Sequence, residues 1–62
     1  MKLGTLVQFA AYGTVMDMGY VSKYDDEPGW IWVDCVKMGP QLVREDSKMM
    51  DVISESRLSR QN

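Results

Sequence analysis

The chain of 62 residues contains no histidine and a single cysteine, Cys35. One cysteine cannot form a disulfide within the chain, and one thiol without histidine cannot complete the ligand set of a structural zinc site. Because the chain has no histidine, a Ser-His-Asp triad is also excluded, and Cys35 has no histidine to act as its base. Because Cys35 lies in an apolar stretch, we interpret it as a small core residue. The sequence therefore predicts a protein that is not an enzyme and holds no metal and no cofactor.

Long hydrophobic runs are also lacking. No apolar run approaches the roughly 20 residues that span a bilayer, and the start of the chain does not have the pattern of a signal peptide. We therefore expect a soluble, intracellular protein without a membrane partner. A chain this short buries only about 60% of its unfolded surface. Its predicted stability depends on aromatic, β-branched and methionine packing, or on a partner.

Positive charge is sparse. The formal net charge is −2, and residues 1–54 carry five basic and eight acidic side chains, a net charge of −3. Non-specific nucleic-acid binding relies on clustered lysine and arginine, so this balance argues against it. The densest acidic run, Asp25-Asp26-Glu27, lacks the ligand spacing of a calcium loop. We interpret this run as a solvated turn before Pro28 and Gly29.

Apolar and polar residues alternate with period two along several short segments, which predicts β-strands. The predicted strands cover residues 3–9, 19–24, 30–38, 41–44 and 51–54. The expected connections are a loop or irregular hairpin over residues 10–17, turns at residues 25–29 and at Gly39-Pro40, and one helical turn over residues 45–50.

The same alternation divides the predicted strands into a buried and an exposed face. In the third strand we assign Ile31, Val33 and Cys35 to the core, because the opposite face includes Asp34. Met49 or Met50 is expected to plug one end of the core. The full predicted core comprises Val7, Val21, Ile31, Val33, Leu42, Val43 or its neighbour, and Ile53.

Four short motifs, in this order and spacing, resemble small bacteriophage-encoded SH3-like β-barrel proteins. They are Gly4-Thr5-Leu6-Val7, Gly19-Tyr20-Val21, Trp32-Val33-Asp34 with Gly39, and Arg44-Glu45-Asp46-Ser47 with Asp51-Val52-Ile53-Ser54. The resemblance implies an all-β fold: a small SH3-like five-stranded barrel over residues 1–54, with one short helical turn before the last strand. Residues 55–62 are expected to form a flexible polar tail. The chain departs from the family pattern at Met38, where an acidic turn residue is common, and at Cys35 or Val36, where an aromatic residue is common.

Tyrosine and tryptophan are enriched at binding hot spots. This chain has three tyrosines and two tryptophans. In SH3-like barrels the first long loop and the connection between the second and third strands flank a shallow groove. The predicted binding residues are therefore Tyr12, Tyr24, Trp30 and Trp32. The alternative is that these aromatic side chains cover the barrel ends and cap the core.

The resulting hypothesis is a non-enzymatic protein–protein interaction module, a phage accessory protein that binds a host or phage protein. One alternative is a structural virion component, so the expected location is the host cytoplasm or the virion. A second alternative is a nucleic-acid-binding SH3-like barrel that uses Lys23, Lys37 and Arg44. The sequence names neither the partner nor the oligomeric state.

Overall fold

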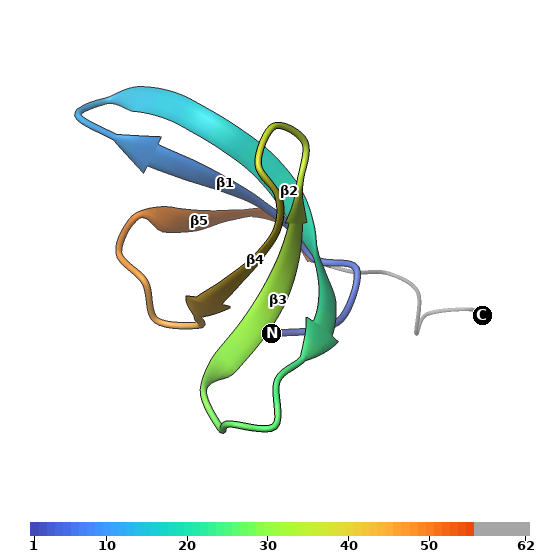
Figure 1. Ribbon diagram of the computed structural model, residues 1–62. Helices are drawn as coiled ribbons and strands as arrows, with labels where there is room; N and C mark the ends of the chain where they lie inside the picture. Colours follow the sequence, from blue (N-terminus) through green and yellow to red (C-terminus); the bar gives the residue numbers. More distant parts are fainter. Residues whose placement is uncertain (56–62) are drawn as a thin grey trace.

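The computed structural model describes residues 1–55 and shows a single strongly curved antiparallel sheet (Figure 1). The strands are β1 (Leu6–Ala11), β2 (Thr14–Tyr24), β3 (Trp30–Cys35), β4 (Gly39–Arg44) and β5 (Met50–Ser54). Their order in the sheet is β4-β3-β2-β1-β5. Within residues 1–55 no backbone pairing joins β4 to β5, so hydrogen bonds do not close the sheet into a barrel. The expectation of an all-β fold with five strands is confirmed.

The first connection is a hairpin, one of the two forms expected over residues 10–17, and it is tighter than expected. Tyr12 and Gly13 form a two-residue turn, with φ angles of 53° and 76°. Two successive positive φ angles are typical of the tight hairpin turn whose twist matches that of the flanking strands. β1 therefore extends to Ala11 and β2 begins at Thr14. A register shift between Phe9 and Ala10 interrupts the alternation, which explains why the pattern in this segment does not indicate a strand.

The connection between β3 and β4 also differs from expectation. β3 ends at Cys35, and the turn expected at Gly39-Pro40 is formed by residues 36–38. Gly39, with a φ of 74°, instead begins β4. Pro40 pairs with Asp34 on an edge strand, where the missing N–H of proline is tolerated.

The helical turn expected over residues 45–50 is wrong, and none of residues 1–55 is helical. Ser47 N–H donates to Arg44 O at 3.1 Å, and Met50 N–H donates to Ser47 O at 3.3 Å. These are two successive tight turns within the five residues between β4 and β5. In the part of the chain that the structure describes, no helix is long and apolar enough to cross a membrane.

The core lies on the concave side of the sheet. The predicted alternation of buried and more exposed residues along β3 is confirmed. The buried apolar residues are Val7, Val21, Ile31, Val33, Cys35 and Met50, with Met1, Phe9 and Val43 packed against them. Of the two methionines considered as plugs, Met50 is buried and Met49 is exposed.

Two residues expected in the core are instead exposed. Leu42 is 41% exposed and Ile53 is 45% exposed. Leu42 pairs with Trp32, whereas its neighbour Val43 pairs with Ile31 and faces the core. Ile53 lies at a register shift, where the pairing with β1 passes directly from Val52 to Ser54. A bulged residue of this kind has no cross-strand partner to hold it against the core.

Gly19 occupies the centre of the sheet, between Val7 of β1 and Cys35 of β3. A Cβ atom at this position would lie 2.5 Å from the backbone oxygen of Asp34. That oxygen belongs to the neighbouring strand and cannot move without disturbing the ladder. The close approach of β2 and β3 therefore requires glycine here.

Candidate interaction surface

Tyr12 lies far from the other aromatic residues predicted to bind a partner. It is fully exposed at the tip of the β1–β2 hairpin, at the opposite end of β2 from Tyr24 (Figure 1). A strand of 11 residues spans up to about 33 Å, at 3.3 Å per residue. The structure therefore does not bring Tyr12 together with Tyr24 and Trp30 around one groove.

Trp30 and Trp32 lie on the outer face of β3, the side turned away from the core, because they alternate with Ile31 and Val33. Both are half-buried and both contact cations of this chain. The Arg44 guanidinium lies 5.8 Å from the centroid of the Trp30 ring, and the Lys23 ammonium lies 5.7 Å from that of Trp32. Such cation–π contacts partly cover the rings. Tyr24 pairs with Ile31, so its backbone position is on the opposite face from Trp30.

The acidic run before Pro28 and Gly29 forms the β2–β3 connection, as the sequence predicts. Asp25 shapes this connection: its Oδ2 accepts the N–H of Glu27 at 3.1 Å, and its Oδ1 accepts the indole N–H of Trp32 at 3.1 Å. Asp25 thus shapes the turn through Oδ2 and ties it to β3 through Oδ1. Among residues 1–55, no three histidine, cysteine, aspartate or glutamate side chains gather where they could hold a metal ion.

An apolar surface that the sequence interpretation does not single out lies on the outer face of β1 and β2. We name Leu6, Met18, Tyr20 and Val36 the outer apolar surface. Leu6, Met18 and Tyr20 are each 45–46% exposed, and Val36 is 82% exposed. Leu6 pairs with Tyr20, and Val36 N–H donates to Met18 O at 2.8 Å, so the four residues are held side by side. They line a shallow hollow of about 460 Å³.

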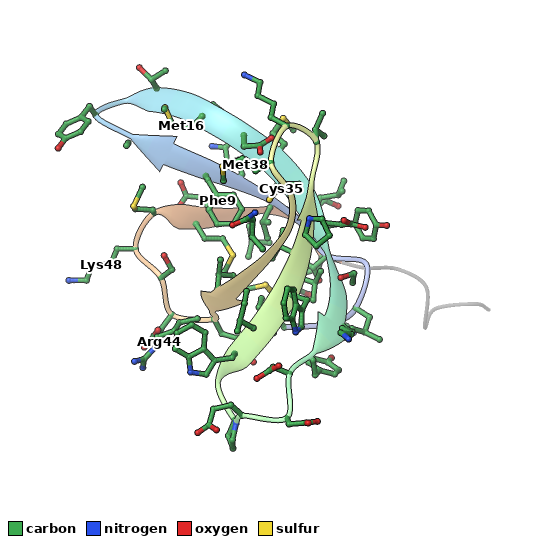
Figure 2. The ribbon with its side chains drawn as sticks, viewed as in Figure 1. Phe9, Met16, Cys35, Met38, Arg44 and Lys48 are labelled. Atoms are coloured by element: carbon green, nitrogen blue, oxygen red, sulfur yellow. The ribbon has the colours of Figure 1, made fainter. Side chains whose placement is uncertain are left out.

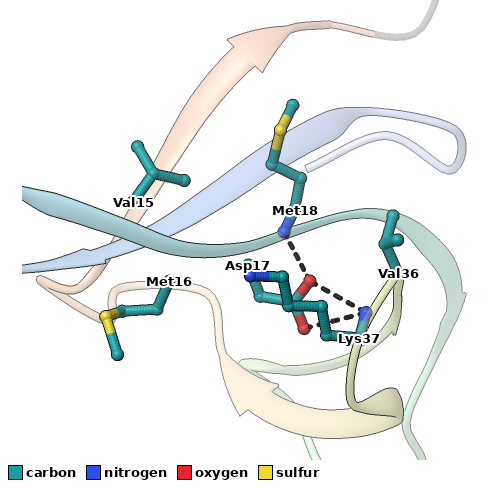
Figure 3. Close-up of a pocket in the computed structure, with 6 residues that line it drawn as sticks. All are labelled: Val15, Met16, Asp17, Met18, Val36 and Lys37. Atoms are coloured by element: carbon teal, nitrogen blue, oxygen red, sulfur yellow. Dashed lines mark hydrogen bonds between the residues drawn. The ribbon is translucent and has the colours of Figure 1, made fainter.

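A second hollow continues this surface toward the β1–β2 hairpin. It has a volume of about 190 Å³ and shares Met18 and Val36 with the first. Its other lining residues are Val15, Met16, Asp17 and Lys37 (Figure 3). Figure 2 labels Met16 on β2 and Met38 in the turn between β3 and β4.

Asp17 fixes the turn that carries Val36. Its carboxylate accepts the N–H groups of Met18 at 2.8 Å, Lys37 at 3.0 Å and Met38 at 3.0 Å (Figure 3 shows the first two). Burial alone would raise the pKa of Asp17, but these three donors and the charge of Lys37 outweigh it, so the pKa lies below its ordinary value. The ionised carboxylate therefore anchors residues 36–38 to β2. The only sequence signal of this role is one aspartate between two methionines.

Asp34 and Tyr20 form a hydrogen-bonded pair on the outer face. The Tyr20 hydroxyl donates to Asp34 Oδ2 at 3.0 Å. This hydrogen bond, the negative charge of Asp34 and burial all raise the pKa of Tyr20. Asp34 lines the hollow of about 460 Å³ and also a third hollow of about 320 Å³. The carboxylate is thus placed between two concave parts of the same face.

Cys35 lies in the core, as the sequence predicts. It is 6% exposed, and its thiol lies 3.8 Å from Val33 O. Burial, followed by the charges of Asp17 and Asp34, raises the pKa of the thiol. A raised pKa disfavours the thiolate, which is the nucleophilic form of cysteine.

Comparisons of the chain with protein-family models, with curated proteins and with solved structures find no match. The resemblance to phage SH3-like proteins therefore stays a prediction.

Proposed function

We propose that this chain is a non-enzymatic protein–protein interaction module, built as a small SH3-like barrel whose sheet is left open between β4 and β5. The strand order β4-β3-β2-β1-β5 and the strong curvature of the sheet (Figure 1) support this proposal. The sequence motifs that resemble phage SH3-like proteins favour an accessory protein of a bacteriophage. Its partner is then a host protein or another phage protein.

The observation that carries the proposal is the outer apolar surface. Period-two strands of a small sheet commonly place polar residues toward solvent. Here Leu6, Met18, Tyr20 and Val36 are exposed together around one hollow. Contiguous exposed apolar patches mark interaction sites on soluble proteins. Tyr20 adds the aromatic body and polar tip that are common at binding hot spots.

The proposal is tested by capture of a partner with two matched variants. Val36→Glu places a charge in the outer apolar surface, and Met49→Glu places the same charge on an exposed methionine of the β4–β5 connection. Because both side chains are exposed, both variants are expected to keep a melting temperature near that of the parent chain. A stoichiometric partner from phage-infected lysate is expected to bind the parent chain and Met49→Glu but not Val36→Glu.

Two results would contradict the proposal. The first is a partner that Val36→Glu retains as well as the parent chain does. The second is the absence of any stoichiometric partner, with the chain recovered only in purified virions, which would favour the structural role instead.

A further inference from the structure

Asp34 is a charged residue in an otherwise apolar part of the outer face. It lies on β3, is half-buried, and pairs with Tyr20 of β2 on one side and Pro40 of β4 on the other. Among residues 1–55 it is the one charged residue that lines the hollow of about 460 Å³, whose walls are the outer apolar surface, Gly19 and Cys35. Asp34 also lines the hollow of about 320 Å³, together with Ser22, Lys23, Trp32 and Pro40.

No cation among residues 1–55 forms an ion pair with Asp34. The two ion pairs in this part of the chain join the Met1 ammonium to Glu45 and Arg44 to Asp46. Lys23, which lines the smaller hollow with Asp34, lies over the Trp32 ring. Asp34 Oδ2 accepts the Tyr20 hydroxyl. The carboxylate is thus oriented by a neutral donor, and its negative charge has no ion-pair partner within the described residues.

We propose that the outer apolar surface recognises an extended segment of a partner protein in which an arginine or lysine stands two residues from an apolar residue, so that both side chains face the same way. This inference rests on the proposed function and names the chemistry of the partner. The basic group pairs with Asp34, while the apolar side chain fills the hollow between Leu6, Met18 and Val36. Charge-assisted hydrogen bonds to a carboxylate are stronger than neutral ones, and arginine can engage both carboxylate oxygens.

Charge complementarity favours this occupant over a nucleic acid. The phosphate backbone would be repelled by Asp34, which lines the hollow. The net charge of the whole chain is −2, which also attracts a basic segment over longer distances.

Four synthetic nine-residue peptides provide the probe. Each has two-residue Gly-Ser flanks around a centre of Leu-Ser-Arg-Ser-Leu, Leu-Ser-Gln-Ser-Leu, Leu-Ser-Glu-Ser-Leu or Ser-Ser-Arg-Ser-Ser. Titration into the ¹⁵N-labelled full chain, followed by NMR, gives both the affinity and the location of binding. We expect the Leu-Ser-Arg-Ser-Leu peptide to bind at least tenfold more tightly than the other three, with shifts concentrated at Leu6, Met18, Tyr20 and Val36.

Two carboxylate variants identify the recognising group. Asp34→Asn removes the charge but keeps an oxygen that can accept the Tyr20 hydroxyl, so the preference for arginine over glutamine is expected to vanish. Asp51→Asn removes an exposed carboxylate of β5 that lines neither hollow, so the preference is expected to remain. Equal binding of the arginine and glutamate peptides, an unchanged preference in Asp34→Asn, or no binding at millimolar concentration would each overturn the inference.

The chain's own residues after Glu55 include Arg57, Leu58 and Arg60, which have the same chemistry as the proposed segment. The double variant Arg57→Gln, Arg60→Gln tests whether these residues, rather than a partner segment, occupy the outer apolar surface. Unchanged peptide affinity in the variant supports the partner segment, whereas peptide binding that appears only in the variant overturns it.

The inference and the proposed function can fail separately. If Val36→Glu abolishes capture of a partner but the peptides show no charge preference, the inference fails and the proposed function stands. If the peptides show the charge preference but no partner is captured, the binding chemistry of the surface stands and the proposed function fails.

Discussion

Ile31 and Leu42 offer a direct test of which face of the sheet is the core. Both belong to the predicted core, but the structure buries Ile31 fully and leaves Leu42 41% exposed. Ile31 is on β3, and Leu42 is on the adjacent strand β4 with its side chain on the opposite face, where it pairs with Trp32. The substitutions Ile31→Ala and Leu42→Ala each remove three carbon atoms. The two variants therefore differ in burial and hardly at all in chemistry.

The magnitudes follow from that burial. Three buried carbon atoms at about 0.8 kcal/mol each give roughly 2.4 kcal/mol, and the cavity raises the cost of Ile31→Ala to about 3–4 kcal/mol. Leu42 already keeps much of its surface in water and its removal opens no closed cavity, so we expect about 1 kcal/mol. The whole chain is expected to have a free energy of unfolding of only about 3–9 kcal/mol. Ile31→Ala should therefore bring the protein close to unfolding.

Urea denaturation followed by far-UV circular dichroism measures both costs, with thermal melting as a second readout. One kcal/mol corresponds to about 4–8 °C in a domain of this size, so Leu42→Ala should lower the melting temperature by roughly 5 °C. Ile31→Ala should lower it by about 15 °C or more. A cost for Leu42→Ala equal to or larger than that for Ile31→Ala would show that β3 and β4 turn their other faces toward the core.

Two further predictions concern backbone packing and pH. Gly19→Ala should destabilise the protein by about 1–3 kcal/mol, because the new methyl group meets the backbone oxygen of Asp34; an unchanged urea midpoint would show that β2 and β3 can separate freely. Asp17 has a folded-state pKa below the ordinary 3.8, so its contribution to stability is full above that value and is lost as the pH falls through the folded-state pKa. The melting temperature of the parent chain should therefore fall in acid more steeply than that of Asp17→Asn, and parallel pH profiles would contradict the assigned role.

The number of strands and the buried face of β3 could be predicted because they depend on local alternation. Ile31, Val33 and Cys35 recur with period two, and the adjacent Asp34 shows which face is exposed. The sequence offers an irregular hairpin over residues 10–17 only as an alternative to a loop, and the two-residue turn of the β1–β2 hairpin could not be predicted. A tyrosine at positive φ is uncommon, so Tyr12 does not indicate a tight turn, and the shift at Phe9 breaks the period. The turn expected at Pro40 is wrong for a related reason. Proline indicates a turn unless the strand is known to lie at the edge of the sheet.

The outer apolar surface is not predicted when residue type is given more weight than strand geometry. Tyrosine and tryptophan suggest binding wherever they occur, but the structure separates Tyr12 from Tyr24 and partly covers both tryptophans with cations of the same chain. A better signal is present in the sequence. Adjacent apolar residues in a strand face opposite sides, so only one residue of each such pair can enter the core. Such pairs occur at Leu6-Val7, Tyr20-Val21, Leu42-Val43 and Val52-Ile53.

In three of these pairs the second residue faces the core and the first residue faces outward. Val7 and Val21 are almost fully buried and Val43 packs against the core, while Leu6 and Tyr20 are 45–46% exposed. The exposed members gain little stability from the fold, since much of their surface stays in water. Their repetition on neighbouring strands is thus not explained by folding alone, and burial against the proposed partner would account for it. An apolar face by itself would bind with little discrimination, and Asp34 supplies the charged group that would set the orientation and chemistry of the bound segment.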